Sequence, residues 1–170
     1  EVRVNVASAG VCGTDVRIVN GTHTAYAGVT DRVPGHEIVG VVSEIADRTA
    51  ATVDVKVGDT VFVAPNIGCW GCRFCRGGNE NLCIRTEALG ITLDGGFAQQ
   101  VIVPAAAVEH GNIIRLNAEL SPDTATLLEP LATAAEMRRR VGADIWDRLV
   151  ARPLGAAIEG AFRDDTVRGV

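Results

Sequence analysis

Four cysteines lie within a short stretch of the chain, and their spacing is that of a metal site. They form the pattern C-x2-C-x2-C-x7-C: Cys69, Cys72, Cys75 and Cys83. Gaps of two residues let successive thiolates turn toward one centre, and four thiolates complete a tetrahedron with no position left for a reactant. The pattern therefore predicts a structural zinc ion rather than a catalytic one.

Two other cysteine-rich sites stay open from spacing alone. Bacterial ferredoxins share the C-x2-C-x2-C start, but their fourth cysteine normally follows about three residues later, before proline. Zinc-ribbon nucleic-acid modules separate two C-x2-C pairs by about 15–20 residues. Seven residues separate Cys75 from Cys83, so structural zinc is favoured. The odd total of five cysteines argues against a disulfide framework.

A second set of potential ligands is dispersed along the chain. Glu129 lies in the apolar run LLEPL, where a carboxylate needs a metal or an arginine as partner, because an unpaired buried charge is costly. With a thiol, an imidazole and a second carboxylate it forms a mixed sulfur, nitrogen and oxygen set: Cys12, His36, Glu37 and Glu129. Catalytic zinc typically keeps one exchangeable position, so this set predicts a catalytic zinc site.

Two residues close to Cys12 could serve such a site. Asp15 could accept the second ring N–H of His36 and fix its tautomer. Thr14 lies two residues from the thiolate, and its hydroxyl could carry a proton away from a bound alcohol.

These side chains must be positioned by a body of short strands. Val2, Val4 and Val6 alternate with polar residues, which is typical of a strand with one buried face. Further strands are expected at 38–45, 60–64, 98–103 and 112–116. The sequence therefore predicts a mainly β, barrel-like body up to about residue 116, with flanking helices.

After that body, the sequence pattern becomes typical of helices. Ser121 is expected to cap a helix that starts at Pro122 and continues to Leu128. Apolar residues at four-residue intervals predict a longer helix over 134–150, and a short one is expected over 154–162.

Composition limits the possible partners. The 170 residues carry a net charge of −5 and only 4% aromatic residues, which argues against nucleic-acid binding. No run approaches the roughly 20 apolar residues of a membrane helix. The first residues alternate rather than forming an export signal, so we expect a cytoplasmic protein.

Taken in order, the motifs resemble those of the zinc-dependent medium-chain alcohol and polyol dehydrogenases. The stretches that carry the resemblance are AGVCGTD (9–15), VPGHEIVGVV (33–42), KVGDTVFV (56–63), CWGCRFCRGGNENLC (69–83), DGGFAQQVIVP (94–104) and LLEPLA (127–132). The resemblance implies a GroES-like barrel catalytic domain over 1–133, with a structural-zinc lobe at about 68–84, and a C-terminal helical return segment over 134–170.

The resemblance also assigns roles. It implies two Zn²⁺ per chain, with Glu129 as the exchangeable ligand beside Cys12, His36 and Glu37. It implies that Thr14 relays the proton, that Asp15 supports the site and that Phe97 lines the substrate pocket. The implied reaction is oxidation of a secondary alcohol or polyol to a carbonyl compound, with hydride transfer to NAD or NADP, in a possible homo-oligomer.

One part of the family pattern is not found in these residues. The family places a Rossmann nucleotide-binding domain after the EPLA segment, and the 170 residues contain no G-x-G-x-x-G. We therefore expect the Rossmann domain to be absent from this chain, and the chain alone to be inactive. The alternative is a non-catalytic, zinc-stabilised binding or scaffold domain.

Overall fold

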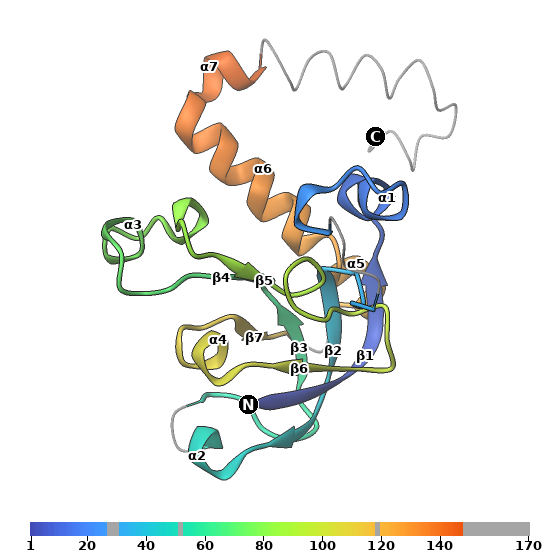
Figure 1. Ribbon diagram of the computed structural model, residues 1–170. Coiled ribbons are helices and arrows are strands. Elements are labelled where there is room, and N and C mark those ends of the chain that lie inside the picture. Colours follow the sequence, from blue (N-terminus) through green and yellow to red (C-terminus); the bar gives the residue numbers. More distant parts are fainter. Residues whose placement is uncertain (27–30, 51–52, 118–119, 148–170) are drawn as a thin grey trace. The chain divides into compact units, whose positions relative to one another are not determined.

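The computed structural model describes residues 1–26, 31–50, 53–117 and 120–147 (Figure 1). Its contacts divide the chain into two compact units, Glu1–Glu129 and Pro130–Val170. Each unit is described by itself. Among the described residues, no helix combines the length and hydropathy needed to cross a bilayer.

The first unit is built on a five-stranded antiparallel sheet (Figure 1). Its strand order is β6-β1-β2-β3-β7. The strands are β1 (Val2–Gly10), β2 (Glu37–Ile45), β3 (Thr60–Val63), β6 (Gln100–Val103) and β7 (Ile113–Arg115), and β4 (Asn66–Ile67) pairs with β5 (Glu87–Ala88) in a separate ribbon. The predicted mainly β body is confirmed, and β1 continues past the predicted alternation to Gly10.

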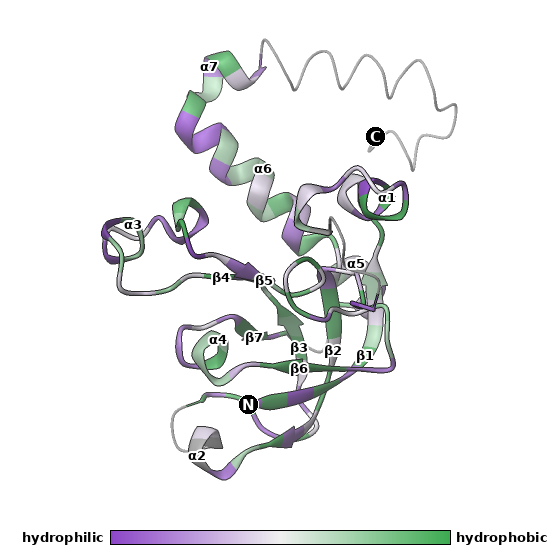
Figure 2. Ribbon diagram, in the orientation of Figure 1, coloured by the Kyte–Doolittle hydropathy of each residue, from purple (hydrophilic) through white to green (hydrophobic). Residues whose placement is uncertain are grey.

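The main core lies on one face of this sheet because the strands alternate, and a smaller buried cluster of Val39, Phe62 and Ala125 lies on the other face. Val2 and Val4 of β1 are fully buried, and so is Val103 of β6, the register partner of Val2. Arg3 and Ile102 pair on the opposite, exposed side. Figure 2 shows apolar residues along β2 and β3, which are central in the sheet. Burial of β-branched side chains therefore fixes the register that carries the site.

Short helices flank this sheet. They are α1 (Gly13–Val19), α2 (Asp47–Ala50), α3 (Arg73–Arg76), α4 (Ala105–Glu109) and α5 (Pro122–Ala125), with 3-10 turns at Thr24–Tyr26 and Glu80–Leu82. The predicted cap of α5 is confirmed, because the Ser121 hydroxyl accepts the Thr124 N–H at 3.3 Å. The helix ends at Ala125, earlier than the predicted Leu128. α5 contacts β1 and β2.

The predicted helix over 134–150 has different bounds in the structure. α6 (Leu128–Val141) begins six residues earlier, because Pro130 falls in its first turn, where a missing N–H costs no hydrogen bond. It ends before Gly142, whose φ of 86° lies in the left-handed region that stops helices. α7 (Ala143–Trp146) follows. The helix expected over 154–162 lies outside the described residues.

Candidate metal centres

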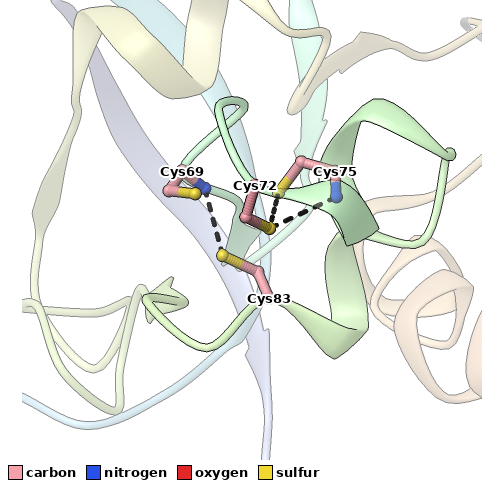
Figure 3. A group of neighbouring side chains, drawn as sticks. All are labelled: Cys69, Cys72, Cys75 and Cys83. Carbon is pink, nitrogen blue, oxygen red and sulfur yellow. Dashed lines mark hydrogen bonds between the residues drawn. The ribbon is translucent and has the colours of Figure 1, made fainter.

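The four cysteines of the predicted structural site converge. Their Sγ atoms all lie within 4.8 Å of one another, and Figure 3 shows the side chains turned toward one another. Cys72 is the N-cap of α3, Cys75 lies within that helix, and Cys83 ends the turn Glu80–Leu82. Cys69 follows β4. This stretch has little regular structure, and its local turns bring the four sulfur atoms together.

Hydrogen-bond donors surround these sulfurs. The Sγ of Cys83 accepts the backbone N–H groups of Cys69 at 3.4 Å and Arg85 at 3.3 Å. The Arg85 guanidinium donates to the Sγ of Cys69 at 3.3 Å. Such donors stabilise thiolates, which are the form that binds metal. Four converging sulfur atoms that accept hydrogen bonds from N–H groups form a site that fits zinc.

The same donors shift the thiol pKa values. The Gly71 N–H, followed by Arg85, lowers the pKa of Cys69 to about 6. The Cys75 N–H lowers the pKa of Cys72, whereas burial raises the pKa of Cys75 itself to about 11. Cys75 would therefore have to lose a proton to bind a metal ion, and a bound cation would supply the energy for that step.

The sequence did not predict that Arg85 contacts a cysteine sulfur, nor how the cysteine lobe is anchored to the main body. Trp70, between two of the cysteines, has a positive φ of 53° and stacks on His110 with ring centroids 3.9 Å apart. His110 ends α4 of the main body. The only sequence signal for Arg85 is a basic residue two positions after the last cysteine, which is too common to single out.

The second group forms where β1 passes into α1 and where β2 begins. Cys12, His36 and Glu37 each place a ligand atom within 4.8 Å of the others. The Sγ of Cys12 lies 3.1 Å from the Nε2 of His36. Gly10 pairs with Glu37 in the β1–β2 ladder, so sheet register sets the distance between the two segments. His36 and Glu37 are buried, and Cys12 is half-buried.

Asp15 and Thr14 both contact Cys12. The Oδ2 of Asp15 accepts the Cys12 N–H at 2.9 Å, and the Thr14 N–H donates to the Cys12 Sγ at 3.2 Å. The other Asp15 oxygen, Oδ1, lies 3.7 Å from the Nδ1 of His36, which is longer than a hydrogen bond. Both atoms are buried without a hydrogen-bond partner. The arrangement suits a neutral imidazole whose Nδ1–H faces Asp15 and whose Nε2 offers a lone pair.

Carboxylates crowd this group. Burial raises the pKa of Glu37, His36 lowers it when its ring is protonated, and the charges of Glu129 and Asp15 raise it again. Buried carboxylates that repel one another are stabilised by a cation between them. This donor set of one thiol, one imidazole and a carboxylate therefore fits a divalent metal ion.

Glu129 is the expected ligand that the structure does not bring into the cluster. It is not among the residues with ligand atoms within 4.8 Å of one another, although its charge acts on Glu37. Its role as the exchangeable ligand stays a prediction.

Phe97 lies beside the loop that carries His36. Backbone hydrogen bonds join the two segments: Gly95 N to Val33 O, Gly96 N to Gly35 O and Phe97 N to Pro34 O, at 2.8, 2.8 and 3.0 Å. Gly35 has φ +93°, and a Cβ there would lie 2.6 Å from the Phe97 ring. Phe97 is 39% exposed, so its ring is available to a small molecule near the loop.

Comparisons with known proteins agree with this fold and these motifs. Residues 1–111 match the family described as the alcohol dehydrogenase GroES-like domain. L-galactonate-5-dehydrogenase of Escherichia coli K12 is 34% identical over 140 residues, which cover 82% of this chain and 38% of that protein.

Two solved structures show the same fold. An alcohol dehydrogenase from E. coli CFT073, complexed with NADH, has a TM-score of 0.65 and 32% identity over 82% of this chain and 37% of its own. A thermostable, cobalt- and zinc-bound alcohol dehydrogenase from Pyrobaculum aerophilum has a TM-score of 0.69 and 31% identity, covering 82% and 40%. The chain spans about two fifths of the length of these relatives.

Proposed function

Because this chain belongs to the alcohol dehydrogenase GroES-like domain family of zinc-dependent medium-chain dehydrogenases, we propose that it is the catalytic domain of such an enzyme. The proposed reaction oxidises a secondary alcohol or polyol to a carbonyl compound, with hydride transfer to NAD or NADP. The observation that carries the proposal is the convergence of Cys12, His36 and Glu37, with Asp15 placed behind the imidazole.

We assign different roles to the two groups of metal ligands. The four-cysteine group would hold a structural zinc ion, and the second group a catalytic one, with Glu129 as the exchangeable ligand. Zinc at the second group would act as a Lewis acid on the substrate oxygen. The proposed domain extends over 1–133, with the lobe at about 68–84 and a return segment over 134–170.

The chain's own residues would orient the imidazole and move a proton. Asp15 would accept the Nδ1–H of His36 and so keep the lone pair on Nε2, which already faces Cys12. Thr14 would relay the proton of the alcohol, because its Oγ1 can accept that proton while its own hydroxyl proton passes to solvent. Its Oγ1 already accepts an N–H of Arg17 at 3.2 Å, which orients the hydroxyl. Phe97 would contact the carbon skeleton of the substrate.

We further propose that these 170 residues do not complete hydride transfer alone. Hydride transfer needs the nicotinamide held against the substrate carbon, and the sequence has no glycine-rich phosphate-binding turn. The relative from E. coli CFT073 binds NADH, which supports a nicotinamide cofactor for the complete enzyme.

Alcohol binding can be tested without the nucleotide. The chain is loaded with Co²⁺, and its visible absorption is followed while isopropanol, sorbitol or glycerol is added. We expect the band of the mixed site to shift with at least one alcohol, and the shift to vanish in His36→Ala. A spectrum insensitive to every alcohol would instead favour a zinc-stabilised scaffold.

A further inference from the structure

Gly10 lies in a strand, and the backbone conformation at this position does not explain why the residue is a glycine. It is the last residue of β1 and pairs with Glu37, the first residue of β2. Its φ is not in the left-handed region, where seven other described glycines lie. Glycine weakens a strand and often marks a place where another group approaches closely. Position 10 therefore requires a glycine because a side chain would have no space there.

The group that fills this space is the Glu37 carboxylate. A Cβ at Gly10 would lie 1.9 Å from the Oε2 of Glu37 and 3.0 Å from its Cδ. It would lie 3.1 Å from the Glu37 Cβ, whereas facing Cβ atoms of antiparallel strands are about 4.5–5.5 Å apart. A methyl group at position 10 and the carboxylate in its present position exclude each other.

Relief of this clash would fall mainly on the carboxylate. Its oxygen is the far end of a flexible side chain and can rotate away, whereas the strands are held by the ladder from Val2 to Gly10. Glu37 is only 6% exposed, so its carboxylate has few other positions. Rotation would separate it from Cys12 and His36, whose ligand atoms now lie within 4.8 Å.

We propose that Gly10 is a positioning residue of the Cys12–His36–Glu37 site, because its missing side chain leaves the space that keeps the Glu37 carboxylate beside the other two ligands. This inference rests on the proposed function, since it assumes that the group binds a metal ion. It adds that a residue of β1 sets the position of the Glu37 ligand, which lies on the neighbouring strand β2.

The chain offers a matched control on the other side of Cys12. Gly13 also lacks a left-handed φ, and a Cβ there would meet no atom within 4 Å other than those of its two chain neighbours and the backbone of its own helix. Gly10→Ala and Gly13→Ala thus add the same methyl group close to the same ligand, and only the first one reaches Glu37.

The test is a Co²⁺ titration of the 170-residue chain in competition with a chelator. The two sites are separable because four thiolates give Co²⁺ stronger charge-transfer absorption than one. For Gly10→Ala we expect an affinity about 10- to 100-fold lower at the mixed site, as when a metal ligand loses its support. The four-cysteine site and the Gly13→Ala variant should behave as wild type. Unchanged affinity in Gly10→Ala would overturn the inference.

A double-mutant cycle identifies the cause. In a Glu37→Ala background, Gly10→Ala should lower the Co²⁺ affinity much less than in the wild type, because the carboxylate that it displaces is gone and only the 3.1 Å contact with the Cβ at position 37 remains. An equal loss in both backgrounds would overturn the inference. If Gly10→Ala alone fails to fold, recovery of folding in the double variant supports the clash with Glu37, and no recovery contradicts it. A wild-type chain that binds no second ion would overturn the proposed function itself.

Discussion

Replacement of Asp15 by asparagine tests how the second metal group is oriented. Asparagine keeps the shape of the side chain, and its oxygen can still accept the Cys12 N–H that Asp15 accepts at 2.9 Å. Its amide NH2 group would then face the Nδ1 of His36 in place of the Oδ1 that lies 3.7 Å away, and would favour a lone pair on that nitrogen. The ring proton moves to Nε2, the nitrogen 3.1 Å from the Cys12 sulfur, so that nitrogen loses its lone pair for a metal.

The expected losses of stability and of metal affinity differ in size. A hydrogen bond to a charged group contributes about 1.5–3 kcal/mol and a neutral one about 0.5–1.5 kcal/mol, so the free energy of unfolding should fall by about 1 kcal/mol. For a chain of this size that corresponds to a Tm lower by about 2–4 °C. Loss of the carboxylate behind a histidine ligand typically lowers metal affinity about 10- to 100-fold.

The assay pairs urea denaturation with chelator competition for Zn²⁺. Asp59→Asn is the control, because Asp59 accepts the N–H of Lys56, three residues earlier, at 2.8 Å and has no part in either metal group. It should lose comparable stability or less and keep full Zn²⁺ affinity. Unchanged Zn²⁺ affinity in Asp15→Asn would refute the idea that Asp15 fixes the tautomer of His36.

The remaining predictions concern the lobe and α6. Cys69→Ser should remove one zinc ion and unfold the lobe while the second group still binds Co²⁺, as measured by metal content and hydrogen exchange; loss of both ions would contradict separate roles. Arg85→Ala should speed zinc release to a chelator severalfold relative to Arg76→Ala, since the guanidinium of Arg85, rather than that of Arg76, donates to the Sγ of Cys69; equal rates would contradict this. Contact with Arg139 and the arginine after it lowers the pKa of Glu136 from 4.5 to about 2, so its stabilisation of α6 is complete above its ordinary pKa and disappears as the pH falls through about 2. Circular dichroism should show this acid loss in wild type and a smaller one in Glu136→Gln.

The sheet was predictable because its signal is local. Alternating valines at Val2 and Val4 mark a half-buried strand wherever they occur, and the structure buries both completely. The ends of the helices were less predictable, because they depend on single residues. Pro130 is tolerated in the first turn of α6, and Gly142 ends that helix, so a periodic pattern that ignores both misplaces its bounds.

The candidate site was predictable in residue type but not in geometry. The motifs single out Cys12, His36 and Glu37, and the structure brings them together. Sequence cannot show that Glu129 lies outside the tight cluster, because that depends on how two distant segments meet. Nor can it show that Gly10 faces the Glu37 carboxylate, because this follows from strand register.

The metal content of the purified chain, measured by inductively coupled plasma mass spectrometry, tests the central claim most directly. Two independent ligand groups predict about two zinc ions per chain in the wild type and about one in Cys12→Ser, with the four-cysteine ion retained. A wild-type chain with a single zinc ion, or a Cys12→Ser variant that still holds two, would contradict a second metal centre.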